Sequence, residues 1–257
     1  MGRILLSFMA LVAIISSTSN LKADDHLDGP INLQVNVCKL NEGRSIAQYN
    51  KAQNAYIKWS KKNDVEVYVA RHTPVFSHDD FMNDRGFDFI EILGGSHKVS
   101  GKAWDKWLGT KEGQKLAADW QKNATCYVKW GHSYPVYLNE EEIESSSDRY
   151  VSWNWCSIND GISYDDLQGQ HDLMVDELKK DSNGIMGWFV MAPQTGAAHA
   201  PGDFVHLAVF KNIENFMEYK ESFANGGWRG YREYNETYAS CIGEELYSEK
   251  ILNNPNN

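Results

Sequence analysis

Two ionisable residues, Glu91 and His206, stand at matching places in two distant parts of the sequence. Each follows an Asp-Phe dipeptide, and each lies two residues after the phenylalanine, Phe89 or Phe204. A carboxylate and an imidazole in one apolar cavity shift each other's pKa and can share a proton. The pair therefore predicts either acid–base catalysis or the binding of a polar ligand group. The alternative is that both are polar residues on a half-exposed face of a sheet.

Two asparagines accompany this pair, since Asn36 and Asn154 each stand two residues before a cysteine. Side chains alternate between the two faces of a strand, so each asparagine opposes the apolar residues of its own strand. We expect the apolar face to meet the helices and the polar face to meet an interior cavity. The predicted ligand-binding residues are therefore Asn36, Asn154, Phe89 and Phe204, beside the candidate catalytic residues Glu91 and His206.

The matching places belong to an internal repeat. Cys38 and Cys156 each begin the pattern Cys, any residue, aliphatic, Asn, acidic, Gly. Pro74 and Pro193 follow at nearly equal distances, and the two Asp-Phe dipeptides come after them. Landmarks that stay in register over this length indicate a duplicated unit. Two unrelated halves with coincidental cysteines are the alternative.

Hydrophobic periodicity predicts one order of elements in both halves: strand, helix, strand, strand, helix, strand. In the first half the strands are expected at 33–40, 65–73, 87–93 and 125–130, and the helices at 45–63 and 102–122. In the second half the strands are expected at 150–158, 187–192, 204–210 and 238–246, and the helices at 164–180 and 213–234. Glycines interrupt the second helix of each half, at 109–113 and 225–227. The predicted repeats span 30–137 and 150–250, and the acidic segment 138–149 between them is predicted to be a linker.

The order βαββαβ is the ferredoxin-like arrangement. Two such units in one chain resemble a fused form of the dimeric α/β barrel superfamily, in which two sheets face each other around a lumen. The predicted fold class is therefore α+β, with two ferredoxin-like repeats forming a pseudo-dimeric α/β barrel. The resemblance covers about residues 30 to 250 and rests on element order and duplication.

This resemblance implies a range of chemistries. The superfamily includes cofactor-free monooxygenases, haem-degrading enzymes and haem-dependent dismutases, and some of them place Asn, His and Trp around a lumen. Asn36, Asn154 and His206 are similar in type. No family motif extends the likeness residue by residue, and the sequence does not indicate a cofactor.

The first 23 residues resemble a signal peptide. Arg3 supplies a positive charge, residues 4–15 are apolar, and small polar residues follow, so cleavage after Ser19 or Ala23 fits. The apolar run is short for a membrane span, which makes an uncleaved anchor the weaker alternative. We predict an exported protein, periplasmic or extracellular, with no membrane span once the signal is removed. The formal net charge of −10 argues against nucleic acid and anionic membranes as partners.

Four cysteines in an exported chain predict two disulfides. A duplicated unit should carry duplicated bonds, which favours Cys38–Cys126 and Cys156–Cys241 among the three pairings. In a ferredoxin-like sheet the first and last strands are neighbours, so each bond would join adjacent strands. The sequence has no CxxC motif and no histidine at a zinc-ligand spacing beside a cysteine, so no metal site is predicted.

Two functions follow from these observations, and the sequence leaves open whether the protein is an enzyme. The first is the binding or conversion of a small molecule in the lumen between the repeats, monooxygenase-like by analogy. The second is a non-catalytic protein-interaction module of the cell envelope, for which we expect a packed lumen and an exposed apolar patch. The sequence predicts no oligomeric state.

Overall fold

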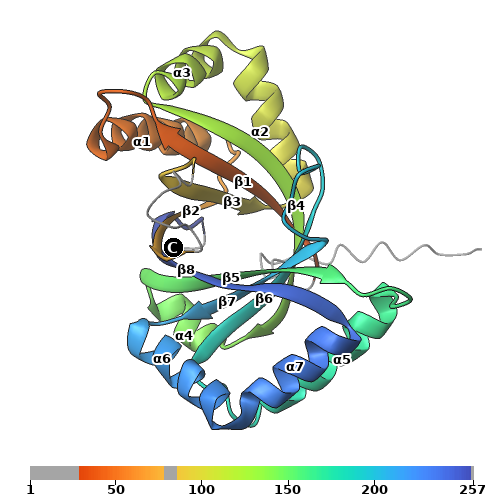
Figure 1. Ribbon diagram of the computed structural model, residues 1–257. Coiled ribbons are helices and arrows are strands. Elements are labelled where there is room, and N and C mark those ends of the chain that lie inside the picture. Colours follow the sequence, from red (N-terminus) through yellow and green to blue (C-terminus); the bar gives the residue numbers. More distant parts are fainter. Residues whose placement is uncertain (1–28, 78–85, 256–257) are drawn as a thin grey trace, which may run out of the picture.

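The centre of the molecule is a closed barrel of eight antiparallel strands in a mixed α/β fold (Figure 1). The computed structural model describes residues 29–77 and 86–255. The first half contributes β1 (Ile31–Leu40), β2 (Tyr68–Phe76), β3 (Phe89–Gly95) and β4 (Ala124–Leu138). The second half contributes β5 (Asp148–Ile158), β6 (Ile185–Pro193), β7 (Phe204–Phe210) and β8 (Ala239–Asn253). Around the barrel the order is β1-β3-β2-β8-β5-β7-β6-β4.

Two long strands, β4 and β8, join the halves. The first part of β4 pairs with β1, and its second part, from Gly131 to Leu138, pairs with β6. In the same way β8 begins beside β5 and ends beside β2. Sequence periodicity predicted only the first parts, because the extensions pair across the two halves and contain interruptions such as Pro135.

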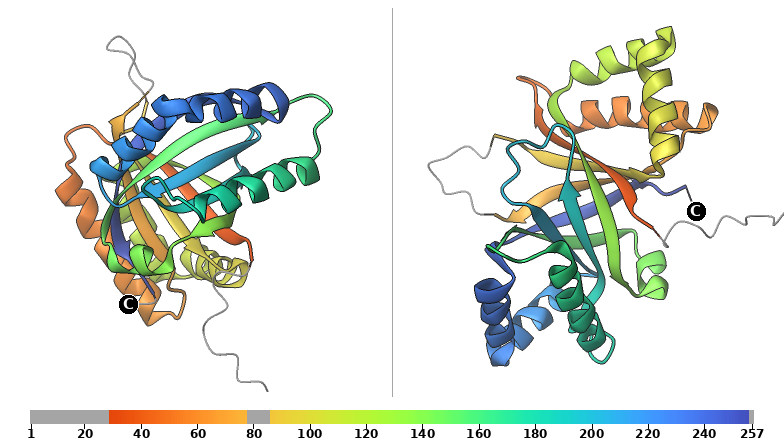
Figure 2. Two further views of the ribbon diagram at one scale, coloured as in Figure 1. Left: turned by 90° about the horizontal axis from the view of Figure 1, so that it is seen from below. Right: turned by 90° about the vertical axis from the view of Figure 1, so that its right-hand side faces the viewer.

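Helices cover the outer faces of the barrel in two layers (Figures 1 and 2). The first layer contains α1 (Ile46–Lys62), α2 (His97–Gly109) and α3 (Lys111–Gln121), and the second contains α5 (Tyr164–Leu178), α6 (Ile213–Ser222) and α7 (Trp228–Thr237). The predicted helix interruptions are confirmed: α2 ends at Gly109, and a π-helix, η1 (Phe223–Gly227), separates α6 from α7. The segment predicted as a linker contains the short helix α4 (Glu140–Ser145).

The repeated sequence pattern has a repeated structural role. Its terminal glycines, Gly43 and Gly161, both adopt positive φ, at 72° and 83°, in the turn after the first strand of each half. The aspartates of the Asp-Phe dipeptides fix that strand end: Leu40 N–H donates to Asp88, and Ile158 N–H donates to Asp203. Ser45 and Ser163 then form capping boxes at the starts of α1 and α5.

Both predicted disulfides are confirmed. Cys38 bonds to Cys126 and Cys156 bonds to Cys241, in each case between directly opposed residues of neighbouring strands. The described residues contain no free cysteine.

The predicted signal peptide lies outside the described residues. None of the helices in residues 29–77 and 86–255 combines the length and apolar character that a membrane crossing requires.

The barrel interior is a packed apolar core. One cluster draws buried residues from seven strands, which can meet only inside the barrel: Leu33, Val35, Ala70, Ile90, Ile92, Val151, Trp153, Met186, Met191, Val205, Leu207, Val209 and Tyr247. The expectation that the polar face of these strands lines the lumen is therefore wrong. The apolar face fills the barrel, and the polar face, with Asn36, Glu91, Asn154 and His206, lies under the helices.

Candidate functional site

The structure separates the six predicted site residues into two clusters on the helix-covered faces. Phe89 and Glu91 contact Tyr49 of α1, in the first half. Phe204 and His206 contact Tyr234 of α7, in the second half. Cross-strand pairing places Asn36 opposite Glu91 and Asn154 opposite His206. Each asparagine therefore accompanies one ionisable residue, and the two ionisable residues do not share a cavity.

Glu91 is the centre of a buried hydrogen-bond network. Its side chain is 1% exposed, and Arg71 donates to one carboxylate oxygen through Nε at 3.1 Å and Nη2 at 2.7 Å. Tyr49 donates to the other oxygen at 2.7 Å and itself accepts from Trp120 Nε1 at 2.7 Å. Burial raises the pKa of Glu91, whereas the Arg71 charge and the Tyr49 hydrogen bond oppose that rise. The network therefore holds a carboxyl group that is easier to protonate than a surface glutamate.

A pocket of about 530 Å³, counted with its open mouth, borders this network. We call it the indole pocket, because Trp104 and Trp107 of α2 and Trp120 of α3 form much of its wall. The remaining lining residues come from β1, α1, β3, α2 and β4: Gln34, Asn36, Gln53, Tyr56, Glu91, Leu93, Ala103 and Val128. The pocket thus lies between the first-half sheet and its helices, and it contains two of the predicted residues, Asn36 and Glu91.

Hydrogen bonds fix two of the indoles. Trp104 Nε1 donates to Gln34 Oε1 at 2.9 Å, and Gln34 Nε2 donates to Asn36 Oδ1 at 2.9 Å. Trp120 is held through Tyr49. Both N–H groups are therefore used within the protein, and the pocket meets the apolar parts of these rings.

Two amide groups of the indole pocket keep unused hydrogen-bonding capacity. Gln53 and Asn36 are each 4% exposed. No described residue hydrogen-bonds to the Gln53 amide, and the Asn36 amide nitrogen likewise has no acceptor among residues 29–77 and 86–255. Neither group is sealed from solvent, because Arg149 Nε is the one fully buried side-chain polar atom without a partner among the described residues. Both groups line the pocket, so a polar atom of a ligand can satisfy them there.

His206 lies in a chain of aromatic side chains. Trp188 Nε1 donates to His206 Nδ1 at 3.0 Å, so the remaining proton is on Nε2, which contacts the Tyr234 hydroxyl at 3.1 Å. The same hydroxyl contacts His171 Nε2 at 2.9 Å. Burial and the nearby His171 lower the pKa of His206 to about 3, and burial lowers that of His171 to about 4. Both imidazoles are therefore neutral at physiological pH.

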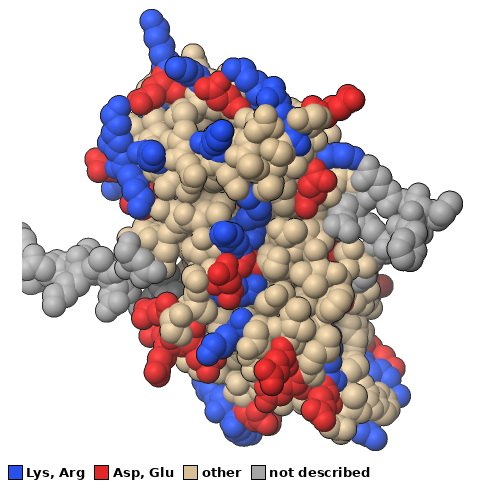
Figure 3. Space-filling view, turned by 90° about the vertical axis from the view of Figure 1, so that its left-hand side faces the viewer, with Lys and Arg blue, Asp and Glu red and all other residues tan. Residues whose placement is uncertain are grey.

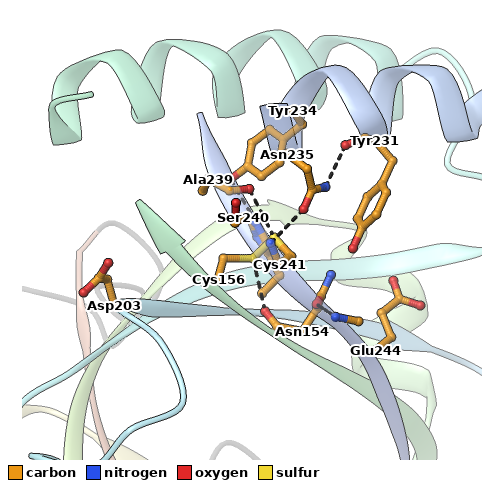
Figure 4. The surroundings of a disulfide bond; sticks show 12 residues. Asn154, Cys156, Asp203, Tyr231, Tyr234, Asn235, Ala239, Ser240, Cys241 and Glu244 are labelled. Carbon is orange, nitrogen blue, oxygen red and sulfur yellow. Dashed lines mark hydrogen bonds between the residues drawn. A yellow bond between two sulfur atoms is a disulfide. The ribbon is translucent and has the colours of Figure 1, made fainter. Parts of the chain in front are cut away.

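Asn154 has a structural role next to the second disulfide. Its Oδ1 accepts from Gly243 N–H at 3.1 Å, beside a register shift of β8. Figure 4 shows Asn154 below the Cys156–Cys241 bond and Asn235 above it, where Asn235 accepts from Cys241 N–H at 2.7 Å. Asn154 is thus committed to the backbone, unlike Asn36.

The sulfur atoms of Cys156 and Cys241 and a ring nitrogen of His206 lie within 4.8 Å of one another. The two sulfurs are bonded to each other and both ring nitrogens of His206 are hydrogen-bonded. This group therefore lacks the thiolates that a metal ion requires.

A row of charged residues crosses the barrel interior at the junction of the halves. Glu249 of β8 contacts His72 Nε2 of β2 at 2.8 Å and lies 3.7 Å from Arg149 Nε of β5. Burial opposes the charge of Glu249, but the hydrogen bond to His72 and the Arg149 charge help to outweigh it and lower its pKa. Trp153 Nε1 donates to the other ring nitrogen of His72 at 3.0 Å. These contacts fill the space in which the lumen ligand was expected.

The sequence indicated only part of the indole pocket. Trp104, Trp107 and Trp120 stand at spacings that also suit a helix packed on a core, so their positions in the sequence do not distinguish pocket walls from core residues. Gln53 carried no signal of its own. Gln34 alternates with Asn36 on β1, so strand periodicity could have placed it beside Asn36 once the covered face was known.

Comparison with known proteins shows similarity in the fold and none in a sequence family. No family model and no curated protein matches the chain in sequence. Among solved structures, a proposed monooxygenase from Lactobacillus acidophilus NCFM is similar with a TM-score of 0.50 at 10% identity, over 87% of this chain and 94% of that chain. A proposed chlorite dismutase has a TM-score of 0.47 at 12% identity, over 87% and 95% of the two chains. The chlorite dismutase of Candidatus Nitrospira defluvii in complex with imidazole has a TM-score of 0.48 at 9% identity, over 87% and 92%.

These similarities concern the backbone. The chain resembles the dimeric α/β barrel superfamily at the level of the fold, as its sequence predicted. At about 10% identity the likeness does not extend to a reaction. Function must therefore be argued from the pocket itself.

Proposed function

We propose that this protein is exported and binds a small molecule in the indole pocket. The observation that carries the proposal is the pair of buried amides, Asn36 and Gln53, with hydrogen-bonding capacity unused in the described structure. An apolar pocket with a few convergent polar groups is the usual form of a ligand site. The pocket replaces the lumen as the binding place.

We also propose that any acid–base step on the ligand uses Glu91, because it is the ionisable carboxyl group bordering the pocket. Its raised pKa makes the Glu91 carboxylate a better proton acceptor than a surface glutamate. His206 belongs to the other half and does not line this pocket. A paired role of Glu91 and His206 on one ligand therefore has no support, and the monooxygenase chemistry of the structural neighbour remains an analogy.

A pocket-filling substitution tests the binding proposal. Ala103 lines the pocket and is 8% exposed, so Ala103→Phe should occupy the ligand's space. Ala118→Leu, on the exposed side of α3, is the matched control. Native mass spectrometry of protein purified from the exported fraction should show a bound mass in the wild type and the control, but not in Ala103→Phe. A metabolite panel screened by thermal shift extends the test. A ligand at 100 times its Kd stabilises a protein by about 2.7 kcal/mol.

The binding proposal fails if neither method detects a ligand for the wild type, or if Ala103→Phe binds as the wild type does. Fractionation and N-terminal sequencing of the mature protein test export separately, with Asn20 or Asp24 expected as the first residue. Recovery of the intact N-terminus in the cytoplasm contradicts export.

The order of strands supports a duplicated origin. In the first half the order is β4-β1-β3-β2, and in the second half it is β8-β5-β7-β6. We propose that these are two ferredoxin-like repeats, spanning about 30–137 and 150–250.

We do not propose nucleic acid as a partner: basic and acidic side chains are interspersed on the face shown in Figure 3.

The interaction module remains a second candidate, because the barrel interior is packed as that hypothesis expected. Tyr127 and Ile242 support it as well. They follow the second cysteine of each disulfide and are 69% and 58% exposed. If a partner uses them, replacing both by serine should abolish a chemically cross-linked complex with that partner while ligand binding in the pocket is retained. A complex of unchanged yield contradicts this candidate.

A further inference from the structure

We propose that the ligand of the indole pocket carries a quaternary ammonium group. This inference rests on the proposed function and specifies its ligand class. The indole pocket combines aromatic walls that meet at an angle, a bordering carboxylate, and two amides suited to a polar tail. Aromatic cages of this composition recognise methylated ammonium groups through cation–π attraction.

The angles between the rings suit a rounded group. Tyr56 and Trp107 meet edge to face, with an interplanar angle of 82° and ring centroids 5.5 Å apart. Trp104, one turn before Trp107 on α2, and Trp120 of α3 add further walls and are fixed by their N–H groups. A flat ligand needs two parallel walls, whereas a tetrahedral trimethylammonium group contacts rings from several directions. Walls that meet nearly at a right angle therefore favour the tetrahedral group.

Glu91 is the one formally charged side chain among the residues that line the pocket, and Arg71 is its ion-pair partner. Arg71 does not line the pocket. Its guanidinium lies over the rings of Tyr49 and Phe89, 5.1 and 4.9 Å from their centroids. Two of the three lysines of α2 are engaged elsewhere, since Lys106 donates to the Asn63 carbonyl and Lys102 to that of Asp64. A cation in the pocket thus meets the carboxylate first and the guanidinium behind it.

The hydrogen-bond count distinguishes a quaternary from a primary ammonium. A primary ammonium has three N–H donors to satisfy, and the Glu91 oxygens already accept three hydrogen bonds, from Arg71 and Tyr49. A quaternary ammonium has no N–H group and needs only the charge and the apolar contact. The unused amides of Asn36 and Gln53 then remain for a hydroxyl or carboxylate at the other end of the ligand.

Three small probes test the proposal by isothermal titration calorimetry with the mature wild-type protein. Choline carries the charge and the methyl groups, 3,3-dimethylbutan-1-ol has the same shape without the charge, and ethanolamine has the charge without the methyl groups. We expect choline to bind at least tenfold more tightly than either analogue. Equal binding of the neutral alcohol overturns the ammonium proposal but leaves the pocket as a binding site. Equal binding of ethanolamine overturns the quaternary assignment.

If none of the three probes binds, the ammonium proposal is overturned, and the metabolite screen with Ala103→Phe decides the binding proposal independently. Variants then locate the site. Trp107→Leu should weaken choline binding at least tenfold, whereas Trp107→Phe, which keeps an aromatic wall, should weaken it less. Trp228→Leu is the matched control, because Trp228 is 38% exposed on α7 in the other half. A folded Trp107→Leu protein with wild-type affinity contradicts the cage.

Discussion

The two halves of the molecule put different chemistry on the same backbone positions. Glu91 and His206 are equivalent residues of β3 and β7, opposite Asn36 and Asn154. The next strand supplies Arg71 beside Glu91 and Val190 beside His206. The carboxylate thus has a guanidinium partner, whereas the imidazole is neutral and is satisfied by Trp188 and Tyr234. The backbone positions correspond in the two halves, and the neighbouring side chains decide whether the site is charged.

The same difference decides where a cavity forms. Around His206 the rings of His171, Trp188, Phe204 and Tyr234 lie with centroids 5.1 to 5.8 Å from the His206 ring. Beside Glu91, by contrast, the amides of Asn36 and Gln53 and the indoles of Trp104, Trp107 and Trp120 line a pocket. The covered face is therefore filled by aromatic rings around His206 and leaves a pocket beside Glu91.

Removal of a disulfide should cause the largest loss of stability, and the loss should be the same for the bond in either half. The bonds close loops of nearly equal length, with sequence separations of 88 and 85 residues. In the chain-entropy model, loops of this length contribute about 4–5 kcal/mol each. Replacing Cys38 and Cys126 by serine, or Cys156 and Cys241 by serine, should therefore lower the unfolding free energy by about the same amount in urea titrations. A difference above about 2 kcal/mol would show that the halves are not energetically equivalent, since this model assigns them the same loop entropy.

The next largest loss of stability is expected at Glu91 and should have no counterpart at His206. Arg71→Met leaves Glu91 buried without its cation, and breaking a buried ion pair in this way costs about 3–5 kcal/mol. The equivalent Val190→Met should cost less than about 1.5 kcal/mol, because it changes only packing. Adding Glu91→Gln to Arg71→Met should recover part of the loss. Purely additive effects in this double-mutant cycle would contradict the coupling.

The neutral site predicts a pH dependence of stability that comes from its two histidines. His171 and His206 have folded pKa values of about 4 and 3, below the ordinary 6.5, so below pH 6.5 the unfolded chain binds protons that the folded chain does not. Their stabilising contribution is complete above that pH and declines as pH falls. Each histidine adds a slope of up to about 1.4 kcal/mol per pH unit. Between pH 6.5 and 5, His206→Gln should reduce the measured slope, and an unchanged slope would exclude His206 as its source.

The smallest expected effects concern the helix starts, where the halves are alike. Ser45 and Ser163 both form capping boxes. Ser45→Ala and Ser163→Ala should each lower the unfolding free energy by about 1 kcal/mol. Thermal melts of the two variants should shift equally, and a clear inequality would show that one cap has an additional role.

The sequence predicted what repetition and periodicity encode. The repeat identified the pairing of Cys38 with Cys126 and of Cys156 with Cys241, and the glycines marked both helix interruptions. Alternation along β1 and β3 correctly separated Glu91 and Asn36 from Val35 and Ile92. It could not say which set faces the helices, because this sheet is covered on both sides, by helices outside and by the rest of the barrel inside.

The indole pocket was hidden for a related reason. Tyr56, Trp104 and Trp107 look like core residues of two helices, and only their placement above the polar face of the sheet makes them pocket walls. The extensions of β4 and β8 were missed because their partners belong to the other half. Local patterns do not contain such long-range pairing.

The place of β8 between β5 and β2 has a consequence for how the protein folds. Strand β2 lies early in the sequence, yet one of its two neighbours in the barrel is β8, the last strand. Next to this pair, Asn253 Nδ2 donates a hydrogen bond to the Val67 carbonyl, which is 186 residues away in the sequence. Closing so long a loop is entropically costly and slows folding. While the chain is being synthesised, β2 presents an unpaired edge until β8 is available to pair with it. The first half is therefore exposed to misassociation through that edge, and a chaperone that covers it would protect the protein.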